Sequence, residues 1–213
     1  MPAKRYAYDY PRPMVTVDAV LFRLIEGDLQ TLLVRRRKPP HKGKWALPGG
    51  FIKMKEPLEE SVIREVGEET GVEDIALLMQ LGTYGDPGRD PRGRVISVAY
   101  VGIVADTAEA TAGDDAAEAK WMPVECLPER LAFDHEQILS DGMSRIVAAG
   151  RNSGVLFAFL PETFTEKQLQ TVLDAVYEEG IPAREYVRYF LDQGLVERAR
   201  GGKRYRFRMG TAG

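Results

Sequence analysis

Three glutamates set close together constrain this chain more than any other feature of its sequence. Glu65, Glu68 and Glu69 have the spacing i, i+3, i+4, so in a helix their carboxylates lie on one face. Like charges packed side by side destabilise a helix, and a hard divalent cation offsets that repulsion. Mg²⁺ in particular prefers oxygen ligands, and water and substrate phosphate complete its coordination. The spacing therefore indicates a metal site, with a solvated acidic helix face as the alternative.

The flanking residues predict where this helix begins and ends. Pro57 suits the first helical position and Gly71 suits the left-handed residue just past the end, so a helix is expected over 57–70. Arg64 precedes Glu68 by four residues and is expected to orient that carboxylate from the flank. An apolar stripe that recurs every four residues predicts the buried face of the helix, and it consists of Leu58, Val62 and Val66.

Segments rich in β-branched and aliphatic residues predict a sheet around this helix. The first two are separated by Glu26-Gly27-Asp28, so they are expected to form two strands joined by a turn. The predicted strands are residues 14–24, 29–35, 75–83, 95–104 and 119–123, and a further helix is expected over 134–149. This order of elements indicates a mixed α/β domain built round one central helix.

The segment from Gly50 to Val72 resembles the Nudix box at every defined position. The matching residues are Gly50, Glu56, Arg64-Glu65, Val66, Glu68-Glu69 and Gly71-Val72, and Trp45-Ala46-Leu47-Pro48-Gly49 is similar to the run-in of that box. Residues 12–149 are therefore identified as a member of the Nudix family, which implies an α/β/α sandwich. The resemblance also implies that water attacks a phosphorus of a nucleoside diphosphate linked to another group, with Mg²⁺ or Mn²⁺ as cofactor.

Roles for individual residues are implied by their positions in the box. The resemblance implies that the three glutamates of the helix are metal ligands and that Gly50 adds a backbone carbonyl. The expected catalytic residues are Glu56 and Arg64, which would position the loop and the helix, together with Glu65, Glu68 and Glu69.

The loop over residues 85–94 is similar to one found in ADP-ribose-type Nudix proteins and their relatives, which implies ADP-ribose or a related nucleotide as the ligand. Guanidinium groups match the oxygens of phosphate and ribose. The expected substrate-binding residues are therefore Asp86, Arg89, Arg92 and Arg94, unless the loop is a polar surface hairpin. The general base stays open, because Glu65, Asp86 or Asp90 could each supply it.

Five further side chains need an interpretation. Tyr84, Phe133 or Trp45 could stack on a nucleotide base, although each is expected to be a core residue. His135 is expected to begin a helix rather than to act as a catalyst, and Cys126 is expected to be a small core residue.

The C-terminal part differs from the rest in its charge. The net charge is only −3, yet residues 181–213 hold eight basic and three acidic side chains, which points to a polyanionic partner. Thr165 and Gln168 form a capping box at the start of a helix that Gly180 is expected to end. A second helix is expected from Pro182 to Gly194, followed by two short strands about a Gly-Gly turn. Two helices and a basic hairpin are the outline of a winged helix-turn-helix.

This outline divides the chain into two expected domains. A Nudix domain is expected over 1–149, with a short N-terminal arm over 1–12, and a winged helix-turn-helix DNA-binding domain over 150–213. The boundary could lie anywhere between residues 133 and 160, with 155–160 as the small strand of the motif. The expected DNA contacts are Arg184 and Arg188 on the second helix and Arg198, Arg200, Lys203, Arg204 and Arg206 on the hairpin.

A Nudix domain followed by such a unit resembles the Nudix-related transcriptional regulators of NAD metabolism. The resemblance implies a homodimer that binds ADP-ribose or a similar nucleotide and double-stranded DNA. Many of these regulators have a decayed Nudix box, whereas the box here is intact, so enzymatic hydrolysis stays possible.

Two alternatives remain. One is an active ADP-ribose pyrophosphatase whose C-terminal unit serves dimerisation. The other is RNA end processing, which is weaker because the sequence shows no RNA-stacking aromatic motif. The single cysteine and the short apolar runs predict a cytoplasmic protein with no membrane segment.

Overall fold

The computed structural model describes residues 8–105, 108–113 and 116–208. Within these residues, seven strands form one sheet: β1 (Met14–Ile25), β2 (Asp28–Arg36), β3 (Trp45–Ala46), β4 (Gly49–Phe51), β5 (Ile75–Tyr84), β6 (Val95–Val104) and β7 (Ala116–Pro123). The main strand order is β3-β2-β1-β6-β5, with β4 beside β1 and β7 beside β2. β1 and β6 run parallel, and the other pairs are antiparallel. The five predicted strands are confirmed, with β7 beginning at Ala116 rather than at residue 119.

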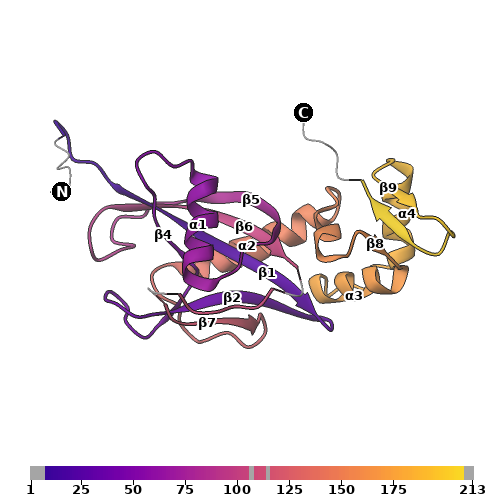
Figure 1. The fold of residues 1–213 in the computed structure, drawn as a ribbon, viewed down its shortest axis with the longest axis horizontal. Helices are drawn as coiled ribbons and strands as arrows, with labels where there is room; N and C mark the ends of the chain where they lie inside the picture. Colours follow the sequence, from indigo (N-terminus) through magenta and orange to yellow (C-terminus); the bar gives the residue numbers. More distant parts are fainter. Residues whose placement is uncertain (1–7, 106–107, 114–115, 209–213) are drawn as a thin grey trace.

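One helix covers each face of this sheet, as Figure 1 shows: α1 (Leu58–Thr70) in front and α2 (His135–Gly150) behind. The central strand β1 is buried on both sides, so its apolar residues alternate between the two helices. The face toward α1 comes from Val17, Ala19 and Leu21, and the face toward α2 comes from Val20 and Phe22. The expected α/β/α sandwich is therefore confirmed.

The caps of α1 agree with the sequence. Pro57, at φ −57°, immediately precedes the first helical residue, and Gly71 closes the helix in the left-handed conformation at φ 71°. Its N–H donates to the Gly67 carbonyl at 2.9 Å. The last two turns of α1 carry the three glutamates and lie beside β4. This placement decides where the candidate site lies.

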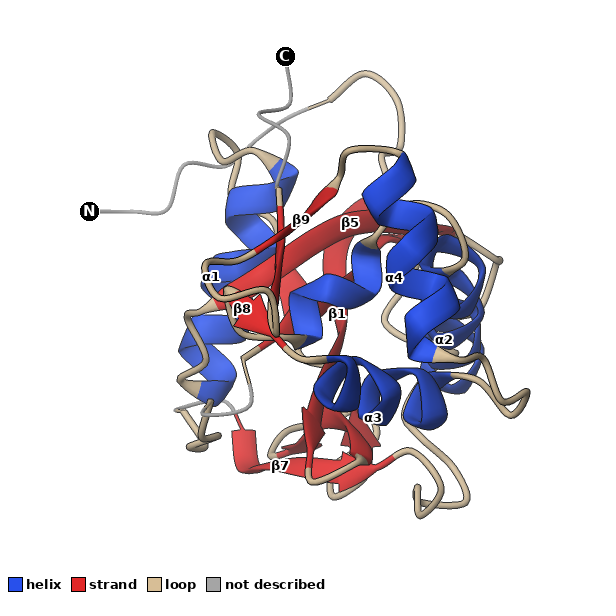
Figure 2. Cartoon of the chain, turned by 90° about the vertical axis from the view of Figure 1, so that its right-hand side faces the viewer, coloured by secondary structure: helices blue, strands red, loops and turns tan. Residues whose placement is uncertain are grey.

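The C-terminal unit follows α2 through the short 3-10 helix η1 (Val155–Phe159). It consists of β8 (Thr163–Phe164), α3 (Glu166–Val176), α4 (Ala183–Asp192), β9 (Val196–Arg198) and β10 (Tyr205–Phe207). β10 lies between β8 and β9 and is antiparallel to both. The predicted capping box is present, because Thr165 and Gln168 bond each other's backbone N–H groups. Two helices beside this small sheet, seen in Figure 2, confirm the winged helix-turn-helix outline.

Three local predictions are wrong. Residues 155–160 do not form a strand, because Gly154 turns the chain at φ 72° into η1, and β8 is the small strand instead. α3 ends at Val176 and does not reach Gly180, because Tyr177 is extended and its hydroxyl donates to the Val147 carbonyl at 3.1 Å. Cys126 is exposed rather than buried, because it lies in the turn that follows β7.

Phe157 of η1 is the centre of the C-terminal core. Its ring centroid lies 4.7 to 5.8 Å from those of four other rings, which belong to Phe164, Tyr186, Phe190 and Phe207. These residues continue the apolar cluster that α2 forms with the sheet. The NUDIX-like sandwich and the C-terminal unit therefore share one apolar cluster. The predicted domain boundary at residue 150 stays a prediction.

Candidate functional site

A cavity of about 380 Å³ opens beside the glutamate face of α1. Its walls come from β1, the end of β2, β4, α1, the loop 85–94 and the start of α2. Of the expected site residues, it brings together Gly50, Glu65, Glu68, Glu69, Arg89 and Arg92. Asp86 and Arg94 are exposed and do not line it, so the structure separates them from the other expected substrate-binding residues.

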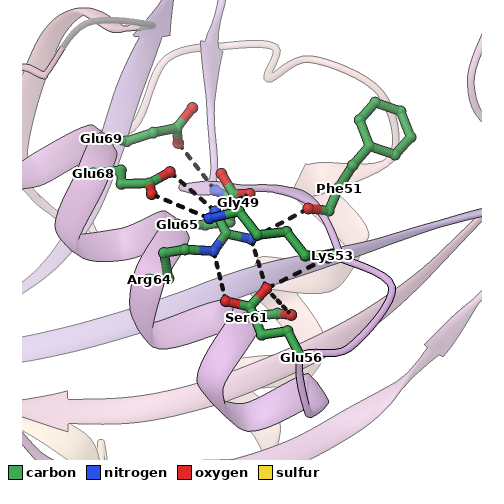
Figure 3. A network of polar contacts seen from close by, with 9 residues as sticks. All are labelled: Gly49, Phe51, Lys53, Glu56, Ser61, Arg64, Glu65, Glu68 and Glu69. Carbon is green, nitrogen blue, oxygen red and sulfur yellow. Dashed lines mark hydrogen bonds and ion pairs between the residues drawn. The ribbon is translucent and has the colours of Figure 1, made fainter. Parts of the chain in front are cut away.

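Arg64 joins the loop before α1 to two glutamates of the helix, as Figure 3 shows. Its Nε and Nη2 donate to the two carboxylate oxygens of Glu56 at 2.7 and 2.9 Å. Its Nη1 donates to Glu65 Oε1 at 2.7 Å and to Glu68 Oε2 at 3.0 Å. The Arg64 bonds, with a further bond from Ser61 Oγ, hold the pKa of Glu56 at about 2. This geometry matches the positioning role expected of Glu56 and Arg64.

Two glycines of β4 allow the glutamates to approach the sheet. A Cβ on Gly50 would overlap the Glu65 carboxylate, and a Cβ on Gly49 would lie 2.7 Å from Asp18 Oδ1. Gly49 N instead donates to Glu69 Oε2 at 3.0 Å. Burial raises the pKa of Glu69 to about 7 despite this bond, and the charges of Glu65 and Asp18 add to the rise. Burial also raises the pKa of Glu65.

The donors of this site fit a divalent cation by their chemistry. All are carboxylate or carbonyl oxygens, and burial, together with the charges of Glu65 and Asp18, raises the pKa of Glu69. Among the described residues, however, no three acidic, histidine or cysteine side chains converge as a ready metal site. Arg64 accounts for this difference, because its Nη1 already bridges Glu65 and Glu68. A cation that bound here would take those oxygens over from the guanidinium.

A buried polar network lies behind the cavity and connects the loop 85–94 to α2. The Arg89 side chain is 4% exposed and donates to both oxygens of Asp134, at 2.8 and 2.6 Å. His135 begins α2, as predicted, and its Nδ1 accepts a hydrogen bond from Leu47 N at 2.8 Å. Burial lowers the pKa of His135, so the ring is neutral with its proton on Nε2, 3.6 Å from Asp18 Oδ1.

Arg92 reaches the cavity from the same loop. Its Nη2 donates to Asp90 Oδ2 at 2.6 Å, and although burial opposes the effect, the Arg92 bonds lower the pKa of Asp90. The guanidinium also lies 4.9 Å from the Phe51 ring centroid and 5.7 Å from that of Phe133. Both arginines that the sequence placed correctly at the cavity, Arg89 and Arg92, therefore already have a carboxylate partner.

The predicted site residues did not include the wall that the end of β2 supplies. This wall consists of Arg35, Arg36, Arg37 and Lys38, a run of four cations that begins at the last residue of a predicted strand, and that run was the available signal. Of the three aromatic side chains considered for base stacking, only Phe133 lines the cavity. Tyr84 instead donates its hydroxyl to Asp141 Oδ2 at 2.8 Å.

A second candidate site lies on the C-terminal unit. α4 buries Tyr186, Val187 and Phe190 and exposes Arg184 and Arg188. The expected hairpin cations are all exposed as well, namely Arg198, Arg200, Lys203, Arg204 and Arg206. In the part of the chain that the structure describes, Arg206 is the one of these seven cations that forms an ion pair, and the other six form none. An exposed helix and hairpin rich in unpaired cations form a surface suited to a polyanion.

The fold and the cavity define a class of protein: an α/β/α sandwich in which a glutamate helix faces a basic wall, extended by a winged helix-turn-helix. The pattern of the NUDIX domain matches residues 14–142. The chain therefore belongs to the NUDIX family, as the box indicated.

Two relatives extend this result beyond the NUDIX domain. The chain is 31% identical over 192 residues to the ADPR responsive transcriptional repressor NtrR of Acinetobacter baylyi, which covers 89% of this chain and 76% of that protein. It is 46% identical over 134 residues to the ADP-ribose pyrophosphatase of Methanocaldococcus jannaschii, which covers 63% of this chain and 75% of that protein.

Two solved structures of one regulator are also similar to this chain. NrtR of Shewanella oneidensis complexed with a 27mer DNA is 31% identical, with a TM-score of 0.75, over 91% of this chain and 93% of that chain. The NUDIX domain of the same NrtR complexed with ADP ribose is 36% identical, with a TM-score of 0.60, over 65% and 94%. Among the described helices, none combines the length and apolar character that a bilayer span requires.

Proposed function

We propose that this chain is a transcriptional regulator whose NUDIX domain binds ADP-ribose or a related nucleotide and whose winged helix binds double-stranded DNA. The exposed, unpaired cations of α4 and of the β9–β10 hairpin carry this proposal. The likeness to NrtR supports it, because that protein has been solved with DNA and matches 91% of this chain. The regulated genes are expected to be those of NAD metabolism, as the family resemblance implies.

α4 is the element suited to enter the major groove. Arg184 and Arg188 would reach base edges or phosphates there, and the hairpin cations would contact the backbone alongside. A winged helix of this size reads one half-site, so a two-fold symmetric site needs a second copy of the chain. The regulator is therefore expected to be a homodimer, which light scattering coupled to size exclusion would measure.

The cavity supports a nucleoside diphosphate as the ligand. Glu65, Glu68, Glu69 and the Gly50 carbonyl would hold Mg²⁺ or Mn²⁺, which would offset the charge of the carboxylates and of the diphosphate. Arg89 and Arg92 would contact the ligand from the loop 85–94. That loop would have to move before Asp86 or Arg94 could reach the same ligand, because both are exposed outside the cavity.

Hydrolysis of ADP-ribose to AMP and ribose 5-phosphate is the second candidate activity. The intact box favours it, and so does the 46% identity with the pyrophosphatase of M. jannaschii. Of the three candidate bases, Glu65 and Asp90 line the cavity and Asp86 does not. In the stricter form of this alternative, the C-terminal unit serves only dimerisation.

Selection of bound duplexes from a random pool tests the DNA assignment. A regulator should enrich a two-fold symmetric sequence, and its affinity should fall steeply as salt rises because phosphate contacts release counterions. If no sequence is enriched, the regulator is the wrong assignment and the dimerisation alternative gains.

Calorimetry with ADP-ribose tests the nucleotide assignment, with Mg²⁺ and then with EDTA. Phosphorus NMR of the same samples shows whether AMP and ribose 5-phosphate form. Binding without products supports a ligand-sensing regulator that does not turn the ligand over, whereas products show that hydrolysis accompanies binding. Absence of binding under both conditions would overturn the nucleotide assignment.

A further inference from the structure

The guanidinium of Arg36 differs from those of three other arginines of the cavity. Arg35, Arg89 and Arg92 pair with carboxylates at 3.8, 2.6 and 2.6 Å. Arg36 lies among them at the end of β2 and forms no ion pair with any described residue. Its Nε donates to the Pro40 carbonyl at 2.8 Å, and its guanidinium carbon lies 4.8 Å from the Phe133 ring centroid. These contacts fix its position without a direct carboxylate partner.

Arg36 is the last residue of β2 and lines the cavity. The register of β2 against β7 shifts at this point, and the extra residue lies on β7. Burial and the neighbouring Arg92 charge lower the pKa of Arg36, although the charges of Glu69, Asp90 and Asp18 oppose the shift.

We propose that Arg36 is the anion-binding residue of the cavity and that it holds the diphosphate of the nucleotide. The carboxylates that would hold the cations lie on α1, whereas Arg36 comes from β2 and would bind oxygens that bound cations leave free. The guanidinium fork suits two such oxygens, and the Phe133 ring holds its plane. This inference rests on the proposed nucleotide binding and adds a residue that neither the loop nor the Nudix box predicts.

Arg36→Gln tests this assignment, with Arg130→Gln as the control, because Arg130 is exposed and lies outside the cavity. The dissociation constant of ADP-ribose, measured by calorimetry with Mg²⁺, should rise at least about 10-fold in Arg36→Gln and less than about 2-fold in Arg130→Gln. Adenosine, which has no phosphate, should bind both variants alike. Arg36→Lys keeps the charge without the fork and should fall between wild type and Arg36→Gln.

Equal affinity of the two Gln variants for ADP-ribose would overturn the role of Arg36, while binding by wild type would leave the proposed function standing. If wild type binds no ADP-ribose, the nucleotide proposal fails and this one fails with it. Circular dichroism melts of each variant show that any lost affinity does not come from unfolding.

A different set of contacts connects this cavity to the DNA-binding surface. At the N-terminal end of α2, Asp134 accepts two hydrogen bonds from the Arg89 guanidinium. His135 accepts one from the backbone N–H of Leu47. Arg89, Leu47 and His135 all line the cavity. The beginning of α2 is therefore attached to the cavity wall through groups that a ligand would touch.

The other end of α2 holds the two helices of the winged helix. The Tyr177 hydroxyl, just after α3, donates to the Val147 carbonyl at 3.1 Å. The buried Tyr186 hydroxyl of α4 donates to the Gly150 carbonyl. The end of α2 is closely packed here, because a Cβ on Gly150 would lie 2.5 Å from the Tyr177 hydroxyl and 2.9 Å from Leu156 Cγ. Figures 1 and 2 show α2 running from behind the sheet to this unit. Its 16 residues correspond to a length of about 24 Å at about 1.5 Å per residue.

We infer that α2 transmits ligand binding to α4 through the Tyr186–Gly150 hydrogen bond. A ligand that shifts Arg89 or His135 shifts the start of a stiff helix whose last carbonyl positions α4. Ligand can alter DNA affinity only if it binds the two states unequally, and this contact gives α4 a way to differ between them. The inference rests on the proposed regulator function but on none of the contacts of Arg36.

Tyr186→Phe removes only the hydroxyl and keeps the buried ring, and Tyr205→Phe is the matched control. Tyr205 also donates a hydroxyl, but to Glu166 Oε1 of α3, at 2.7 Å, rather than to α2. The dissociation constant of the selected duplex is measured with and without ADP-ribose. The fold-change caused by ADP-ribose should fall to less than half its wild-type value in Tyr186→Phe and should persist in Tyr205→Phe. Reciprocity requires DNA to change ADP-ribose affinity by the same factor.

An unchanged ligand effect in Tyr186→Phe would overturn the role of this contact, because the regulator itself would still respond. No ligand effect in wild type would instead contradict the proposed regulation by nucleotide, and the inference about α2 would fail with it.

Discussion

The glutamate face of α1 and the outer face of α4 treat charge in opposite ways. On α1 one guanidinium is shared among three carboxylates, and the side chains of Arg64 and Glu65 are only 17% and 14% exposed. On α4 the side chains of Arg184 and Arg188 are exposed and, within the described chain, have no carboxylate partner. The first arrangement fixes side chains before anything binds, whereas the second leaves cations available to phosphates.

Solvation explains this difference. A charge withdrawn from water needs a fixed partner, because an uncompensated buried charge is strongly destabilising. An exposed charge is screened by salt and contributes little to the free energy of unfolding. Substitutions at the charged face of α1 are therefore expected to disturb the geometry of the site. Substitutions on the exposed face of α4 are expected to change binding affinity and to leave the fold unchanged.

The largest expected effect breaks one region and spares the other. Phe157 is buried among four aromatic rings, and Phe157→Ala should lower the free energy of unfolding of the C-terminal unit by about 3–5 kcal/mol. Denaturant titration measures this loss, and Phe159→Ala, at a partly exposed position of the same turn, should cost less. If the division at residue 150 holds, the variant loses DNA binding and keeps nucleotide binding. Loss of both would show that the two regions fold as one unit.

The next effect concerns the glutamate face. Glu69→Gln keeps the shape of the side chain but removes a charge that the cation needs, so hydrolysis of ADP-ribose should fall at least about 100-fold. Initial rates at saturating Mg²⁺ measure this, and Glu60→Gln, an exposed position on the same helix, should keep the wild-type rate. A wild-type rate in Glu69→Gln would show that Glu69 is not a metal ligand. The test requires that wild type turns ADP-ribose over.

The elements that the sequence predicts best are those with local causes. α1 has its stripe of apolar residues, its proline and its closing glycine within a few turns, and its bounds agree to one residue. Residues 155–160 look equally apolar, yet they form η1, because the packing of Phe157 against residues far along the chain decides their conformation. The exposed Cys126 shows the same limit, since residue type alone does not reveal a surface turn.

The same distinction holds for the site. The glutamates were predictable because one helix carries them at a spacing that only a helix brings together. The basic wall was not, because Arg36 meets Phe133 across almost a hundred positions, a contact that only the folded chain brings about. Arg89 and Arg92 line the cavity, and their role in substrate binding stays a prediction. Their partners Asp134 and Asp90 become evident only in the folded chain.

The DNA-binding surface offers a finer comparison between unpaired and paired cations. Arg184→Ala and Arg188→Ala should each weaken duplex binding and reduce the slope of log affinity against log salt by about 1 if each contacts one phosphate. Arg206→Ala should have a smaller effect, because Arg206 already pairs with Glu162 at 3.2 Å. Fluorescence anisotropy of a labelled duplex at several salt concentrations measures both quantities. Equal effects at all three positions would show that the ion pair of Arg206 in the free protein does not affect its contribution to duplex binding.

The smallest expected effect tests whether the α1 network exists without any ligand. Arg64 holds the pKa of folded Glu56 at about 2, whereas an unfolded glutamate has a pKa of about 4.3. The depressed value means that the carboxylate stabilises the fold fully above about pH 5 and loses this contribution as the pH falls toward 2. The melting temperature of wild type should therefore exceed that of Glu56→Gln at pH 5, and the gap should narrow as the pH falls. Glu59→Gln, exposed at the start of α1, should show no such narrowing. A gap that stays constant with pH would mean that Arg64 does not hold Glu56 in solution, and the contrast between a fixed α1 and an open α4 would then fail.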